Sequence, residues 1–204
     1  MKNILFIAVL IATLNCKAQS PIVSMVDFEN NDDLELTDGC YLKDVENKFF
    51  PFLGTWTWID NNNEFTITFT KLEAVYNSGG NYYSDYLIGK YKYIENGVEI
   101  VNTTNYNGIN ANNFFSSDGF PYVIEGSGYS GDTYMYLGYY DRIKNKNCKA
   151  SVELLNTLED LNGNVVATQM QWKLWDKENV TINGEPALPQ GFSIPTNVIL
   201  TKVE

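Results

Sequence analysis

The chain has 204 residues, with 14 Lys and Arg against 25 Asp and Glu and no His, which gives a formal charge of −11 at pH 7. Its hydrophobic content of 44% is too high for a disordered acidic chain, and its length suffices for one sizeable core. The absence of His excludes Ser-His-Asp and Cys-His nucleophiles and His-ligated zinc from this chain, and the acidity argues against nucleic acid, whose phosphates need clustered Lys and Arg.

Residues 1–18 have the layout of a secretory signal peptide. A short basic start precedes an apolar run over 4–14, which is too short to span a bilayer, and the small residues Cys16 and Ala18 fit cleavage after Ala18. The alternative is a lipobox with Cys16 as the lipidated residue, although Asn15 is bulkier and more polar than the residue that normally precedes such a cysteine. We expect export to the periplasm or outside the cell, with membrane contact only through a lipid anchor in the second case.

The segment 19–49 is rich in acids and amides, above all over 27–33, and is predicted to be an extended N-terminal segment. Cys40 and Cys148 are the cysteines that remain after removal of the signal peptide. An even number of cysteines in an oxidising compartment predicts a disulfide between them, which would tie this segment to the rest of the chain. Two separately buried thiols are the alternative.

From Phe50 onward, short alternating segments separated by Asn, Asp and Gly predict β-strands. In the clearest case Phe65, Ile67 and Phe69 face one side, and the intervening threonines face the other. The dipeptide Asn96-Gly97 is a strong signal for a type I′ hairpin turn. The predicted strands are 55–59, 65–72, 85–95, 98–104, 133–141, 149–158, 165–175 and 197–203, with a polar insertion over 105–131.

The number and spacing of these strands predict an all-β fold. About eight strands with short connections close most economically as an antiparallel up-and-down β-barrel, because closure removes exposed sheet edges. We therefore expect a barrel domain over 50–204, preceded by the acidic segment. A two-sheet β-sandwich is the alternative, since periodicity alone does not separate the two.

The tripeptide Gly54-Thr55-Trp56, at the start of the first predicted strand, resembles the G-x-W motif of lipocalin-like barrels. The resemblance implies that Trp56 plugs the closed end of the barrel and that Gly54 permits close packing there. It also implies that Lys202, on the last strand, takes the place of the arginine that stacks on this tryptophan in the family. The only arginine of the chain, Arg142, lies elsewhere.

Nearly the whole chain is also similar to a set of short exported proteins of Bacteroidetes, grouped only as a domain of unknown function. The matching features are the signal end over 15–19, Gly54-Thr55-Trp56, the stretch 85–91, Cys148 before a strand, and the ending over 194–202. This likeness implies export and the barrel fold, and it implies no activity.

The aromatic residues are the main candidates for ligand binding. Tyr134 and Tyr136 share one face of a predicted strand with Gly138, while Met135 and Leu137 share the opposite face, and both faces are apolar enough to be buried. Filling of the barrel interior accounts for many rings, but their excess favours a cavity or groove for a small apolar molecule or a stacked sugar. The candidate ligand-binding residues are Trp58, Tyr91, Tyr93, Tyr134, Tyr136 and Trp172.

The acidic stretches are weaker candidates. Residues 27–33 and the turn residues Asp160, Asn162 and Asn164 offer oxygen ligands at alternate positions, but neither stretch completes an EF-hand loop. Asx turns and a solvated acidic segment explain both, so we expect no metal and no cofactor. No Asp or Glu stands clearly at an inward strand position, where an acid and a base would have to meet, so we expect no catalytic activity.

The sequence therefore predicts an exported, monomeric, non-catalytic barrel that binds a small apolar ligand or a glycan. A structural or interaction protein of the cell envelope, with a solidly packed barrel, is the alternative. A cavity of more than about 300 Å³ favours the first interpretation, and a filled interior favours the second.

Overall fold

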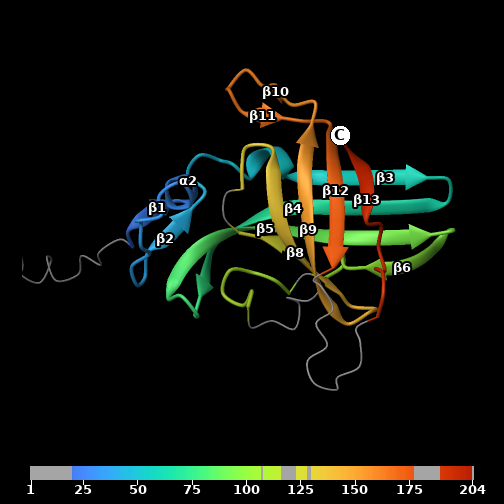
Figure 1. The fold of residues 1–204 in the computed structure, drawn as a ribbon, viewed down its shortest axis with the longest axis horizontal. Coiled ribbons are helices and arrows are strands. Elements are labelled where there is room, and N and C mark those ends of the chain that lie inside the picture. Colours follow the sequence, from blue (N-terminus) through green and yellow to red (C-terminus); the bar gives the residue numbers. More distant parts are fainter. Residues whose placement is uncertain (1–19, 107, 116–122, 128–129, 177–188, 204) are drawn as a thin grey trace, which may run out of the picture.

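The computed structural model describes residues 20–106, 108–115, 123–127, 130–176 and 189–203 (Figure 1). The signal-peptide residues 1–18, with Cys16, lie outside these ranges, so their cleavage and lipidation stay predictions. Among the described residues, no helix is long and apolar enough to cross a membrane. The elements are β1 (Ile22–Ser24), α2 (Met25–Glu29), β2 (Tyr41–Lys43), the 3₁₀ turn η1 (Phe50–Phe52), β3 (Gly54–Asp60), β4 (Asn63–Asn77), β5 (Tyr82–Glu95), β6 (Val98–Asn102), β7 (Ile124–Gly126), β8 (Tyr134–Asp141), β9 (Lys146–Leu155), β10 (Leu158–Glu159), β11 (Val165–Val166), β12 (Gln169–Asp176) and β13 (Asn197–Lys202).

Eight antiparallel strands close into a barrel. Around the barrel the order is β3, β4, β5, β7, β8, β9, β12 and β13, and β13 closes the ring by pairing Thr201 with Thr57 of β3. Because this order follows the chain, the prediction of an up-and-down barrel is confirmed over the sandwich. In Figure 1, β3, β4 and β5 cross β8, β9 and β12 at a steep angle.

The long strand β5 has two neighbours along one edge. Its residues Leu87–Gly89 pair with β7, and its residues Lys92–Glu95 pair with β6. The strand β7 in turn meets β8 at the single register pair Glu125 and Gly138. Among the described strands, β6 pairs only with β5, and it lies outside the closed ring of eight strands.

The predicted alternation and turn chemistry are confirmed in β4 and β5. Phe65, Ile67 and Phe69 are buried in the core, while threonines on the other face of β4 pair with threonines of β3 through hydroxyl hydrogen bonds of 3.0 Å. Asn96 and Gly97 both have positive φ, 52° and 79°, which a type I′ turn requires, and the turn joins β5 directly to β6.

The closed end of the barrel is built around Trp56. Its indole is fully buried, and Nε1 donates a hydrogen bond of 2.8 Å to the carbonyl oxygen of Phe52 in η1. The Lys202 ammonium lies 5.1 Å from the centre of the Trp56 ring, on its face. Gly54 has φ of 107°, and a Cβ there would lie 3.3 Å from Cε of Lys202, so glycine leaves room for that side chain.

The acidic segment joins the barrel sheet instead of standing apart from it. The strand β1 pairs in parallel with β2, and β2 pairs in parallel with the start of β5. The Ser24 hydroxyl caps the short helix α2 by accepting hydrogen bonds from the amides of Val26 and Asp27. Met25 and Leu42 are buried in the main core, so this segment contributes to the same hydrophobic core as the barrel.

The predicted disulfide between Cys40 and Cys148 is not formed in the structure, where each cysteine is a buried thiol. Cys40 immediately precedes β2 and lies beside the start of β5, where its carbonyl accepts a hydrogen bond from Tyr83. Cys148 points into the main core from β9. Only Cys148 belongs to the main core, and the arrangement is that of the alternative, two separately buried thiols.

Candidate functional site

The structure divides the predicted ligand-binding residues into two groups. Tyr91, Tyr93 and Trp172 point into the barrel, and Trp58 packs against the core while half-buried. Tyr134 and Tyr136 stand on the outer face of β8, where Tyr136 is 61% exposed. The sequence could not make this division, because alternation gives two faces but does not say which one is inside.

Aromatic rings fill the barrel interior. Phe65 connects two of the candidate residues, with ring centres 5.6 Å from Trp172 and 6.2 Å from Tyr93. Deeper inside, the rings of Tyr91 and Tyr139 meet edge to face at 5.6 Å, and burial raises the pKa of Tyr91 to about 12. This packing leaves the space available to a ligand near the open end rather than at the centre.

A hollow of about 360 Å³ lies at this open end. It is bounded by the ends of β5 and β6, by the turn between β8 and β9, and by the segment 192–196 that leads into β13. The lining residues are Tyr93, Glu95, Ile100, Ile143, Phe192, Ser193, Ile194, Pro195 and Thr196. Of the predicted ligand-binding residues, Tyr93 is the one that contributes to this hollow.

Two buried charged residues hold the segment 189–196 in place. The Asp141 carboxylate is fully buried and accepts hydrogen bonds of 2.7 and 2.8 Å from the amide and hydroxyl of Ser193. Lys146 is 2% exposed, donates to the carbonyl of Pro189 at 2.9 Å, and lies 4.5 Å from the centre of the Phe192 ring. The segment is therefore an anchored wall of the hollow.

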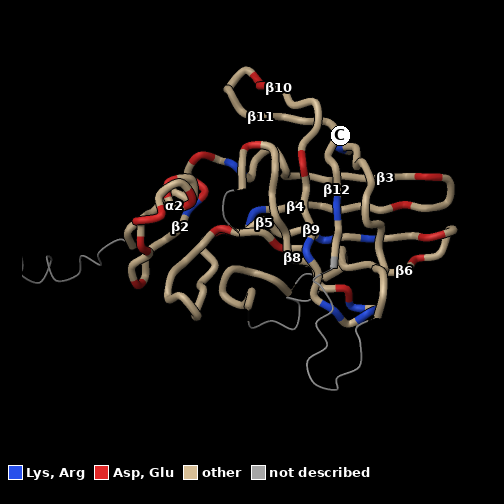
Figure 2. Tube along the Cα trace, viewed as in Figure 1, with Lys and Arg blue, Asp and Glu red and all other residues tan. Residues whose placement is uncertain are grey.

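Charge is distributed unevenly around the open end. Figure 2 shows acidic residues on the β3–β4 and β5–β6 hairpins and basic residues near the turn between β8 and β9. Within the hollow, the Glu95 carboxylate accepts a hydrogen bond of 3.3 Å from the Tyr93 hydroxyl. Burial, together with the charge of Glu95, raises the pKa of Tyr93. The hollow thus combines apolar side chains with a lining surface that is mostly polar, and Glu95 is its one acidic acceptor.

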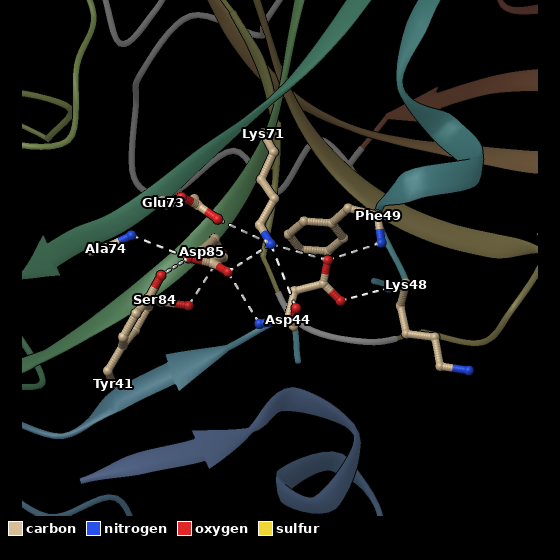
Figure 3. A network of polar contacts seen from close by, with 9 residues as sticks. All are labelled: Tyr41, Asp44, Lys48, Phe49, Lys71, Glu73, Ala74, Ser84 and Asp85. Atoms are coloured by element: carbon tan, nitrogen blue, oxygen red, sulfur yellow. Dashed lines mark hydrogen bonds and ion pairs between the residues drawn. The ribbon is translucent and has the colours of Figure 1, made fainter. Parts of the chain in front are cut away.

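The largest cluster of buried charge lies elsewhere, between the N-terminal segment and the barrel (Figure 3). Asp85 of β5 is fully buried, and its carboxylate accepts hydrogen bonds from the Tyr41 hydroxyl, the Ala74 amide at 3.1 Å and the Asp44 amide at 3.1 Å. The Lys71 ammonium lies 3.1 Å from Asp85 and 3.4 Å from Asp44. A bulge in β4, where Ala74 has φ of 54°, turns that amide toward Asp85.

This cluster is internally satisfied. Asp44 also accepts from the amides of Lys48 and Phe49 at 2.6 and 3.2 Å, so both carboxylates are fully engaged. Burial lowers the pKa of Lys71, but the hydrogen bond to Asp85 and the nearby acidic charges outweigh it and leave that pKa raised. The arrangement stabilises the docking of residues 41–49 and leaves no carboxylate oxygen open to a substrate.

Sequence reasoning missed this cluster. Asp44, Lys71 and Asp85 are far apart in the chain, and nothing in the local sequence marks the first two. Asp85 differs, because it stands in a strand whose surrounding residues are buried. That interruption of an apolar run was the one available signal. Its partners could be identified only when the β2–β5 and β4–β5 pairings were known.

The turn around Asp160, which the sequence offered as a metal site, has a structural role. The Asp160 carboxylate accepts hydrogen bonds from the amides of Asn162 and Asn164 and from the Asn164 side chain, which lower its pKa and close the turn before β11. Across the described ranges, no three Asp, Glu, Cys or His side chains gather closely enough to hold a metal ion.

Comparison with known proteins gives one match. Residues 1–203 match the model of a family of unknown function (DUF6705). No curated protein and no solved structure matches the chain. The function has to be argued from this protein's own residues.

Proposed function

We propose that this chain, which belongs to the family of unknown function DUF6705, is a non-catalytic protein that binds a small, largely apolar molecule at the open end of its barrel. The observation that carries this proposal is the hollow of about 360 Å³ beside Tyr93, which falls within the size range of small-molecule sites. Its wall over 192–196 is anchored by buried Asp141 and Lys146, so the site needs little ordering when a ligand enters.

The lining favours an amphipathic ligand, which has an apolar part and several hydrogen-bonding groups. Ile100, Ile143 and Phe192 supply apolar surface, while Glu95 supplies a carboxylate acceptor beside the Tyr93 hydroxyl. An anionic ligand is disfavoured, because it would meet both Glu95 and a chain whose net charge is −11.

We propose a binding role rather than catalysis because the fully buried carboxylates are committed to structure. Asp44, Asp85 and Asp141 each accept several hydrogen bonds from the surrounding chain, which leaves them poorly placed to exchange protons with a substrate. The basic start, apolar run and small-residue exit of residues 1–18 support export of the binding domain.

The filled interior favours a second candidate, a structural protein of the cell envelope. Rings such as Phe65 and Trp172 occupy the space that a deep ligand cavity would need. On this interpretation, the hollow is only a recess between β6 and the segment 192–196, and it binds nothing.

Native mass spectrometry of the protein purified from its own host distinguishes the two candidates. We expect a small molecule to accompany the wild type and the variant Ile199→Glu, but not Ile143→Glu. Ile143 and Ile199 are both exposed isoleucines, at 56% and 46%, and only Ile143 lines the hollow. The variant Ile199→Glu therefore controls for a new surface charge.

A fluorescence titration with a neutral naphthylamine dye tests the same site when the protein is made in a foreign host. The dye should brighten with the wild type and Ile199→Glu, and the affinity should fall at least about tenfold for Ile143→Glu. An equal response from all three proteins, or none from the wild type, would contradict the proposal and favour the structural reading.

A further inference from the structure

A second surface, independent of the hollow at the open end, lies on the outer face of β7, β8 and β9. Alternation along β8 buries Met135, Leu137 and Tyr139 and turns Tyr136, Gly138 and Tyr140 outward. Tyr136 is 61% exposed on this face, so packing in the core does not explain the presence of a tyrosine there.

Two hollows, of about 270 and about 260 Å³, lie along this face and share Glu125 and Gly138. The first is flanked by Tyr136 and Lys149, and the second by Tyr140 and Asn147. Because the two hollows share Glu125 and Gly138, they lie side by side along β8, and we call them together the trough. A tyrosine stands at each end, and the β9 side carries a lysine and an asparagine.

The middle of the trough is formed by a carboxylate resting on bare backbone. Glu125 and Gly138 are register partners, and a Cβ at Gly138 would lie 2.4 Å from Oε1 of Glu125. Glycine at this position therefore allows the carboxylate to lie flat on the strand. A Cβ at this position would force the end of the flexible Glu125 side chain to shift, so glycine is what allows the carboxylate to rest on the strand.

Glu125 has no partner for its acceptor oxygens among the described residues. Burial raises its pKa, although the residue is only half-buried and its oxygens still reach the trough. This contrasts with Asp44, Asp85 and Asp141, whose oxygens are all occupied. A ligand that donates hydrogen bonds would supply partners for the carboxylate oxygens of Glu125.

We propose that this trough binds a neutral saccharide. A pyranose ring offers an apolar face that can lie on the Tyr136 ring and hydroxyl groups that can donate to the Glu125 carboxylate. Lys149 and Asn147 can donate to ring and hydroxyl oxygens from the β9 side. A purely apolar ligand would leave Glu125 unpaired, and an acidic one would be repelled by it.

The test is isothermal titration with soluble cello-, xylo-, malto- and chito-oligosaccharides. We expect at least one series to bind the wild type, and we expect Tyr136→Ala to weaken that binding at least about tenfold. The matched control is Tyr76→Ala, which removes another exposed tyrosine from β4, outside the trough, and should leave the affinity unchanged. Thermal melting of each variant checks that it is folded.

Two further variants separate the carboxylate from the rings. Glu125→Gln keeps the shape of the side chain and should weaken binding by several fold, and Gly138→Ala should abolish it by displacing that side chain. No binding of any of the four series up to about 10 mM overturns the proposal. Equal losses from Tyr76→Ala and Tyr136→Ala overturn it as well. Neither result bears on the hollow beside Tyr93, which is tested by Ile143→Glu.

Discussion

Asp85 is the residue on which the attachment of the N-terminal segment depends. It is fully buried, and the hydroxyl of Tyr41, the amides of Asp44 and Ala74, and the ammonium of Lys71 all donate to it. A carboxylate is the natural residue at such a point, because its two oxygens can accept several hydrogen bonds at once while balancing a cation.

The substitution Asp85→Ala should lower the free energy of unfolding by about 3–5 kcal/mol, because it leaves three donors without an acceptor and removes from Lys71 the nearest of its acidic partners. Asp85→Asn should fall between this variant and the wild type. Urea unfolding measures the loss, and Asp32→Ala, which removes an exposed acid of the same N-terminal segment, is the control. A midpoint of Asp85→Ala equal to that of the wild type would show that the cluster contributes nothing.

Glu125 presents the opposite case, a carboxylate that costs stability. Since burial raises its pKa in the folded state, ionisation penalises folding once the pH exceeds the ordinary Glu value of about 4.3. We expect Glu125→Gln to be more stable than the wild type at pH 7 and the difference to vanish below about pH 4. Urea unfolding across this pH range checks it, and a constant difference would show that Glu125 is not strained by burial.

At the scale of elements, the segment 189–196 is the part that shapes the open end. It carries no strand or helix of its own, and its position is set by Asp141, Lys146 and Trp172, whose Nε1 donates to the carbonyl of Pro195 at 2.8 Å. The turn between β8 and β9 and the lead-in to β13 are therefore one unit, although 50 residues separate Asp141 from Gly191 in the chain.

Loosening this segment should expose Cys148, which lies in the core next to Lys146 in the same strand. In a Cys40→Ser background, we expect a thiol reagent to label Cys148 slowly in the otherwise wild-type chain, faster in Ser193→Ala and fastest in Asp141→Ala. Asp160→Ala is the matched control, because that aspartate closes an exposed turn with a similar set of hydrogen bonds. Equal labelling rates in all variants would mean that the segment is held by other contacts.

At the scale of the whole molecule, the barrel is held without a covalent link between its layers. The N-terminal segment, the closed end and the open end are each fixed by a different device: a buried ion cluster, a lysine stacked on Trp56, and an anchored segment. Cys40 and Cys148 lie in separate places and remain thiols.

We therefore expect reduction to leave the melting temperature of the mature protein unchanged. Thiol titration in denaturant without reductant should detect both Cys40 and Cys148, whereas the native protein should react slowly because both are buried. A fall in melting temperature on reduction that is absent in Cys148→Ser would reveal a disulfide and contradict the structure.

The sequence by itself determined the strands and favoured a barrel, whereas the strand pairing decided between the barrel and the sandwich. A period of two in β4, the Asn96-Gly97 turn and the short connections are local features, and closure into a barrel follows from the need to pair strand edges. The same local rules predicted a disulfide that the structure does not contain, because counting cysteines carries no information on where their strands lie.

Only the tertiary structure decided which face of each strand is inside and which distant residues meet. Alternation presented Tyr136 and Leu137 as equivalent candidates for burial, and closure of the ring turned the first outward and the second inward. Likewise Glu125 and Gly138, or Asp44, Lys71 and Asp85, become a trough and a buried cluster only through strand register. Local chemistry thus determined the elements, whereas the sites arise from contacts between elements, which no local pattern records.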